Sequence, residues 1–177
     1  KLLEYDSSDK YERFPEIISE QKANSLGYNV IFNELLSKIG IKEVVITGIH
    51  IASYGKDFKD LEYTFANLLE DLNKTSIQRI RYTTSHPRDL DDATIEVMGK
   101  GGNIMPHLHL PVQSGDDYIL KKMNRKYDYA TYKKIADHVR SRVKDVTITS
   151  DFIAGFPGET EEDFEELKEF VRWAKFE

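Results

Sequence analysis

The stretch that decides the fold is HLHLPVQSGDD, residues 107–117. Its first four residues alternate histidine with leucine, which is typical of a short buried strand. The next seven carry a proline, an amide, a hydroxyl, a glycine and two acids, more hydrogen-bonding groups than a turn requires. The stretch therefore reads as a strand that ends either in a structural turn or in one wall of a binding site.

The same change from apolar to polar sequence occurs on both sides of this stretch. Apolar, β-rich runs predict strands over residues 43–47, 80–84, 107–110 and 147–153. Helical patterns predict helices over 30–39, 63–72, 91–100, 118–123, 128–143 and 160–173, with Asp91, Asp128 and Thr160 as N-terminal caps and Gly40 and Gly101 beyond helix ends. Strands that alternate with helices indicate an α/β fold with a parallel sheet. Residues 1–25 lack such a pattern and are interpreted as an arm or linker, and residues 26–177 as one domain.

The composition limits the function classes. The chain has 177 residues, no cysteine and no apolar run near the ~20 residues of a membrane span. It therefore offers no disulfide, no thiolate for zinc and no ligand for an iron–sulfur cluster, and we expect a cytoplasmic protein with no membrane partner. Its 31 acidic and 25 basic residues give a net charge of −6, opposite to that of a free-standing nucleic-acid binder.

Four polar loops follow the four predicted strands, at residues 47–57, 84–90, 111–117 and 154–160. The connections at the opposite ends of the strands are short and carry few candidate ligand-binding side chains. Parallel α/β folds bind ligands at the carboxyl ends of their strands, so these loops predict a ligand site along one rim. Gly48, Gly115 and Gly155 would let the backbone approach a ligand closely, although each could also simply make a tight turn.

Several rim side chains have two interpretations. His86 could act near neutral pH or be a hydrogen-bonded rim residue, and Arg88 could meet a phosphate or carboxylate or stay solvated. His107 and His109 should face the same side of their strand, as cofactor contacts or as a buried pair, and no third ligand at a suitable spacing supports zinc. A basic cluster follows the third loop and is either a solvated helix face or a contact for a polyanion: Lys121, Lys122, Arg125 and Lys126.

The loop text resembles a known family. The segments TGIHIASYGKD (47–57), RYTTSHPRDL (81–90), HLHLPVQSGDDYILKKMNRKY (107–127) and SDFIAGFPGETEEDF (150–164) resemble the radical S-adenosylmethionine (SAM) methylthiotransferases. The likeness covers residues 43–177. This family modifies adenosines beside the anticodon of tRNA. TSHPR resembles the branch acting on isopentenyl-type adenosine, TGIH with YGKD resembles the threonylcarbamoyl-adenosine branch, and a third branch acts on an aspartate of a ribosomal protein.

The resemblance implies a partial (β/α) TIM-like radical-SAM barrel that binds SAM and two [4Fe–4S] clusters in the full-length protein. It implies a radical that abstracts hydrogen from the substrate, addition of sulfur and a methyl group, and tRNA and a sulfur donor as partners. By position, Thr47 and Gly48 would contact the methionine end of SAM, and Gln113 and Ser114 its ribose. The adenine would be held by Ser150, Asp151, Ile153, Gly155 and Phe156, and the tRNA would be contacted by His86, Arg88, Lys122 and Arg125.

The sequence departs from the family in its cysteines. The family has a three-cysteine loop, an N-terminal domain with three more cysteines and a small RNA-binding module, and none is present. The loop would be expected between Ile17 and Val30. We expect these parts to belong to a longer protein and the printed chain to be inactive without them, so no catalytic residue and no metal ligand is assigned.

Two alternatives remain. The first is a cysteine-free, non-catalytic scaffold that binds SAM or RNA. The second is an aldolase-like barrel, which lacks a lysine at a strand end for a Schiff base.

Overall fold

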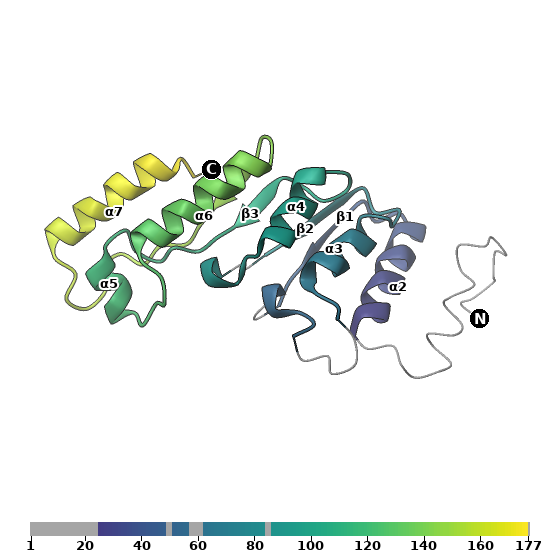
Figure 1. Cartoon of the computed structure of the whole chain (residues 1–177), viewed down its shortest axis with the longest axis horizontal. Helices are drawn as coiled ribbons and strands as arrows, with labels where there is room; N and C mark the ends of the chain where they lie inside the picture. Colours follow the sequence, from purple (N-terminus) through teal and green to yellow (C-terminus); the bar gives the residue numbers. More distant parts are fainter. Residues whose placement is uncertain (1–24, 49–50, 57–61, 84–85, 177) are drawn as a thin grey trace.

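The described residues form an α/β fold whose strands run parallel. A computed structural model describes residues 25–48, 51–56, 62–83 and 86–176, with only the backbone for 25–31 and 88. Its strands are β1 (Glu43–Ile46), β2 (Arg79–Tyr82), β3 (His107–His109) and β4 (Thr147–Thr149). Figure 1 shows the helices following one another along an open, curved row of strands.

The strands pair in two parallel ladders. Glu43 of β1 lies opposite Arg79 of β2, and His107 of β3 lies opposite Thr147 of β4. An isolated parallel bridge between Ile80 and Ile104, just before β3, connects the two ladders. The predicted parallel α/β architecture is therefore confirmed.

Helices connect the strands, as parallel neighbours require. The helices are α2 (Ser25–Lys38), α3 (Phe65–Leu72), α4 (Asp92–Lys100), α5 (Asp117–Lys122), α6 (Tyr129–Arg142) and α7 (Glu161–Ala174), with short 3-10 turns η2 (Ile51–Ser53) and η3 (Pro87–Asp89). The predicted arm lies outside the described residues, apart from Ser25, which begins α2. None of the helices described is long and apolar enough to cross a membrane.

The helix ends follow the sequence signals. Asp91 and Asp128 each accept a hydrogen bond from a backbone N–H at 2.8 Å, from Thr94 and Thr131 respectively. Thr160 forms a capping box with Asp163 at the start of α7. A side-chain oxygen at this position satisfies an N–H group that has no partner within the helix, so these residues fix where each helix begins. Thr64 and Asp116 cap α3 and α5 in the same way.

The fourth strand is shorter than predicted, because a side chain interrupts its ladder. Beyond β3, Pro111 has no N–H to donate, and the N–H of Val112 donates to the hydroxyl of Ser150 at 2.9 Å rather than to a carbonyl. Backbone pairing resumes at Gln113, which forms an isolated bridge with Phe152. The predicted strand 147–153 is thus split into β4 and a single later bridge.

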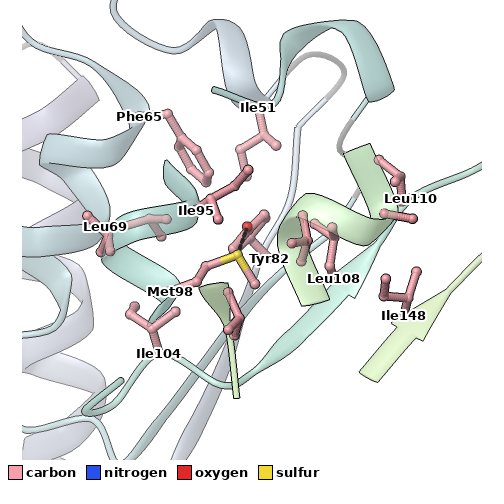
Figure 2. Packing of buried hydrophobic residues seen from close by; sticks show 14 of the residues in the cluster. Ile51, Phe65, Leu69, Tyr82, Ile95, Met98, Ile104, Leu108, Leu110 and Ile148 are labelled. Carbon is pink, nitrogen blue, oxygen red and sulfur yellow. Dashed lines mark hydrogen bonds between the residues drawn. The ribbon is translucent and has the colours of Figure 1, made fainter. Parts of the chain in front are cut away.

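A continuous apolar core lies between the strands and the helices. Tyr82 of β2 meets Phe65 of α3 and Met98 of α4 in this core (Figure 2), and Ile80, Leu108 and Ile148 belong to the same buried cluster. The Tyr82 hydroxyl contacts the Met98 sulfur at 2.8 Å, and burial raises the pKa of Tyr82. The core holds one face of the strands against the helices, which leaves the other face and the carboxyl ends available for a site.

Candidate functional site

The carboxyl ends of the strands bring the predicted loops to one rim. Thr47 and Gly48 come directly after β1 and are exposed, while the next two residues lie outside the described part. His86 precedes the turn η3 after β2, and its Nδ1 lies 3.9 Å from Asp89 Oδ2. The Arg88 side chain lies outside the described residues, so its predicted role stays a prediction.

Gln113 and the segment after β4 lie side by side. The Gln113 N–H donates to the Asp151 carbonyl at 3.0 Å, and the Ile153 N–H donates to the Gln113 carbonyl at 2.9 Å. Gln113 has φ of 73°, in the left-handed region that non-glycine residues rarely adopt. Three of the predicted site positions, Gln113, Asp151 and Ile153, therefore lie together on one part of the rim.

Ser114 and Ser150 use their hydroxyls inside the protein. Ser114 is fully buried, and its hydroxyl accepts a hydrogen bond from the Asp116 N–H at 3.2 Å. The Ser150 hydroxyl holds Val112, as described above. Both serines brace the third loop in this geometry, and a direct contact of either with a ligand stays a prediction.

The rim glycines differ in what surrounds them. A Cβ on Gly115 would lie 2.7 Å from Leu167 Cα and 2.8 Å from Phe170 Cβ, so α7 occupies the space. Close packing of α7 is enough to require a glycine at position 115, and the approach of a ligand to its backbone stays a prediction. Gly155 has φ of 74° and nothing within 4 Å of a built Cβ, and a Cβ on Gly48 would make only ordinary contact with Ile51.

The fourth loop contains an acceptor that sequence reasoning missed. The Glu159 carboxylate accepts hydrogen bonds from the N–H groups of Gly155 and Phe156 through Oε2. Its other oxygen, Oε1, is buried without a hydrogen-bond partner in the described residues. Within the acidic run 159–169, only the position of Glu159 directly ahead of the Thr160 cap distinguishes it from the other acids in the sequence.

The strand face turned away from the helices carries a row of polar side chains. Strand alternation puts Arg79 and Arg81 of β2 on this face, and both contact Glu43 of β1 at 2.7 and 2.9 Å. His107 and His109 of β3 also lie here, on the same side of their strand as predicted. A closed barrel normally fills this face with bulky apolar residues, so its polarity indicates contact with polar groups or water.

Thr149 connects the two histidines. Its Oγ1 lies 3.0 Å from His109 Nδ1 and 3.2 Å from His107 Nε2. His109 Nε2 lies 3.3 Å from Asp151 Oδ2, and the Asp151 side chain is 68% exposed at the rim. The register His109↔Thr149 creates the contact, and the sequence alone did not supply that register.

Hydrogen-bond donors and acceptors can be assigned along this row. A carboxylate only accepts, so the Asp151 contact places a proton on His109 Nε2. With neutral rings, Thr149 then donates to His109 Nδ1 and accepts from His107 Nε2. His107 Nδ1 is left as a buried acceptor that has no hydrogen-bond partner among the described residues. Burial, followed by the charges of Arg81 and His109, lowers the pKa of His107 and favours this neutral form.

The basic cluster reaches the rim at one point. The Lys122 ammonium lies over the Tyr118 ring, 4.5 Å from its centroid, and next to Gly158 of the fourth loop. Arg125 is half-buried, and Lys121 and Lys126 are exposed. The structure therefore brings Lys122 close to the predicted cofactor loops.

The rim loops suit a nucleoside, but the chain does not suit an iron–sulfur cluster. Glu159 Oε1 offers an unused acceptor, Gly155 leaves open space, and Ile153 exposes 41% of an apolar side chain that could lie against a planar base. These features fit the adenosine part of SAM. Thiolates hold [4Fe–4S] clusters, and the sequence has no cysteine. Within the described residues, no three histidine or acidic side chains are placed to hold a metal ion.

Comparison with known proteins identifies the class. The sequence profile of the Radical SAM superfamily matches residues 17–171, and the chain belongs to this superfamily. Curated relatives include proteins named tRNA-2-methylthio-N(6)-dimethylallyladenosine synthase. The one from Oceanobacillus iheyensis is 50% identical over 138 residues, or 78% of this chain and 27% of the relative. Those from Staphylococcus haemolyticus and Bacillus subtilis are 49% and 46% identical over 142 residues, or 80% of this chain and 28% of each relative. The chain thus spans little more than a quarter of the length of these relatives.

Proposed function

We propose that the intact protein carrying this sequence adds a methylthio group to N6-dimethylallyladenosine in tRNA by radical SAM chemistry. The observation that carries the proposal is the identity of 46–50% over 138–142 residues to synthases named for this product. This likeness favours the isopentenyl-type branch over the threonylcarbamoyl-type branch, and tRNA over a ribosomal protein.

The rim would hold SAM. In this proposal Thr47 and Gly48 contact its methionine end, Gln113 approaches its ribose, and Asp151 lies beside them at the edge of the polar row. Ile153, Gly155 and Phe156 surround the adenine, with Glu159 as an additional acceptor, while Ser114 and Ser150 act mainly by bracing the loop. When bound, SAM supplies a 5′-deoxyadenosyl radical and a methyl group.

The tRNA contact would be local, because the chain as a whole is acidic. Lys122 lies beside the fourth loop and Arg125 follows it, while His86 and Arg88 belong to the second loop. Positive charge beside the rim would attract a phosphate of the substrate without a basic surface over the entire domain. The sulfur donor is a further partner that the reaction requires.

The cluster would be held by cysteines that the printed sequence does not contain. Intact-mass and iron analysis of the purified protein tests this part. We expect a mass well above 20.5 kDa, with cysteine and iron present. A mass of 20.5 kDa without iron after anaerobic reconstitution would instead support the non-catalytic scaffold, which the absence of cysteine favours.

Nucleoside analysis of tRNA tests the activity. In cells lacking the gene, we expect 2-methylthio-N6-dimethylallyladenosine to disappear and the unmodified N6-dimethylallyladenosine to accumulate, with recovery on complementation. Loss of the methylthio-threonylcarbamoyl nucleoside would instead assign the protein to the threonylcarbamoyl-adenosine branch. Unchanged tRNA nucleosides would refute the proposal.

A further inference from the structure

Two buried tyrosines hold the backbone of the third rim loop. The Tyr132 hydroxyl donates to the Leu110 carbonyl at 2.7 Å, at the end of the apolar run. The Tyr127 hydroxyl donates to the Val112 carbonyl at 2.9 Å, and the Pro111 carbonyl lies within 3.3 Å of it. Burial raises the pKa of Tyr127, so its hydroxyl keeps the proton that makes it a donor.

The loop needs this restraint because its next residue is strained. Gln113 has φ of 73°, a conformation that is unfavourable for a residue with a Cβ. Such a conformation persists only when its surroundings fix it. The Val112 carbonyl belongs to the peptide unit that joins Val112 to Gln113, so a hydrogen bond to this oxygen directly limits rotation at Gln113.

Tyr127 also contacts the second rim loop. Its ring meets the His86 ring edge to face, with centroids 5.4 Å apart and planes at 76°. The Tyr132 ring instead packs against Phe170 of α7, at 5.4 Å. Of these two tyrosines, Tyr127 is thus the one that joins the second and third loops.

We propose that Tyr127 is a positioning residue that joins two rim loops into one ligand-contacting surface. Its hydroxyl fixes the peptide before Gln113 in the left-handed conformation, and its ring fixes His86. The proposal rests on the proposed function in one respect, namely that the third loop contacts SAM. Without the hydroxyl, the binding-competent loop becomes a fraction of the population, and the apparent affinity falls by that fraction.

The test compares three substitutions that each remove one buried hydroxyl. Tyr127→Phe removes the bond beside Gln113. Tyr132→Phe removes the bond to Leu110, farther from Gln113 in the same loop, together with a contact to Ser150, and Tyr82→Phe removes the contact with Met98 in the core. All three are expected to lower the melting temperature, because each leaves a polar or polarisable partner unpaired. If Tyr127 had only a structural role, the three variants would not differ in ligand affinity or in exchange of the loop amides.

Affinity for S-adenosylhomocysteine separates the variants. In the intact protein reconstituted with iron and sulfide, we expect Tyr127→Phe to raise Kd roughly tenfold, equivalent to about 1.4 kcal/mol, and the two controls less than twofold. In turnover, KM for SAM should rise in Tyr127→Phe while kcat stays close to that of the wild type. An unchanged Kd in Tyr127→Phe, or an equal rise in Tyr132→Phe, would overturn the proposal.

Hydrogen exchange tests the restraint without any ligand. The Gln113 and Ile153 amides, which bond across the third and fourth loops, should exchange faster in Tyr127→Phe than in Tyr132→Phe. Equal rates would refute the restraint. If the wild type bound no S-adenosylhomocysteine, the proposed function would fail, and the exchange rates would still decide for or against the role of Tyr127.

His86→Ala provides a second variant that leaves the hydroxyl in place. It removes the ring contact with Tyr127 together with the Asp89 contact inside the second loop, so we expect a Kd increase of a few-fold and unchanged exchange at Gln113. An unchanged Kd would show that the His86 contact does not contribute to binding. It would overturn the proposal that Tyr127 joins the second and third loops.

Discussion

At the scale of single residues, Thr149 connects His107 and His109 on the polar strand face, and Gly115 lets α7 pack against the third loop. Strand alternation correctly placed His107 and His109 on one side. Thr149, which bridges them, could not be found, because its contact depends on the register between β3 and β4. Ser114 was assigned to a ligand from the family resemblance and Gly115 could serve a ligand or a tight turn, whereas the structure shows the Ser114 hydroxyl in a local turn and α7 packed against Gly115.

Gly115→Ala should destabilise the protein. The added methyl would lie against Leu167 and Phe170, at distances that force either the loop or α7 to move. Overpacking of this kind costs about 1–3 kcal/mol, and chemical denaturation measures it. Gly48→Ala is the matched control, because its methyl makes ordinary contact and should be close to neutral. Equal stability of the two variants would contradict the packing of α7 against the loop.

His107 should make stability depend on pH. Its folded pKa lies below the ordinary value of 6.5, so between the two values the unfolded chain binds a proton that the folded chain does not. The contribution of His107 to the free energy of unfolding is therefore fully present above about pH 6.5. It is lost as the pH falls from there through the lowered pKa of the folded state.

Urea denaturation at several pH values between 7 and 5 measures this effect. His107→Gln retains a donor for Thr149 but cannot titrate, so its free energy of unfolding should fall less steeply than that of the wild type. A His107→Gln curve parallel to the wild type would show that this histidine carries none of the dependence.

At the scale of helices and strands, the boundaries set by local chemistry were predicted well. Asp91, Asp128 and Thr160 begin their helices as expected, because each cap bonds a backbone group three residues away. The ends of β2 and β4 were predicted too late. Their lengths depend on partners in neighbouring strands, such as the Ser150 hydroxyl that replaces a ladder bond at Val112, and these partners are distant in the sequence.

Two capping boxes allow a matched comparison of helices. Thr160→Ala and Thr64→Ala each remove an N-terminal cap and should each lower the free energy of unfolding by about 1 kcal/mol. Only Thr160 adjoins Glu159 and the fourth rim loop, so only Thr160→Ala should also weaken binding of S-adenosylhomocysteine. Titration calorimetry of both variants measures this affinity. Equal affinities would show that the start of α7 does not affect ligand binding.

At the scale of the whole molecule, the loop motifs indicated the family, and the fold confirmed the arrangement that brings them together. Gln113 and the residues after β4 are 38–40 positions apart, and parallel pairing places them side by side. The contacts of Tyr127 with Val112 and His86 could not be predicted in the same way. The sequence around a tyrosine between two helices does not indicate which residue its hydroxyl will bond.

The edge of β1, which pairs only with β2 among the described strands, should favour self-association of the printed chain. Val45 is 54% exposed on the strand face that carries Glu43, and Phe32, Leu35 and Ile39 are exposed in the helical segment on the other side of this edge. Exposed apolar residues beside a strand edge promote pairing between copies. Light scattering should show Val45→Lys to be less associated than the wild type at the same concentration. Val171→Lys, on α7, should not differ, and a monomeric wild type would contradict the prediction.

The left-handed backbone at Gln113 has a practical consequence. The loop is held through the main-chain N–H and carbonyl of this residue and through the carbonyl before it, so the amide side chain contributes little to the shape of the loop. Asparagine and glycine tolerate the same backbone conformation. Position 113 is therefore a suitable point of attachment for an unnatural side chain, such as an infrared or fluorine reporter, that would sense the rim from within an unchanged loop.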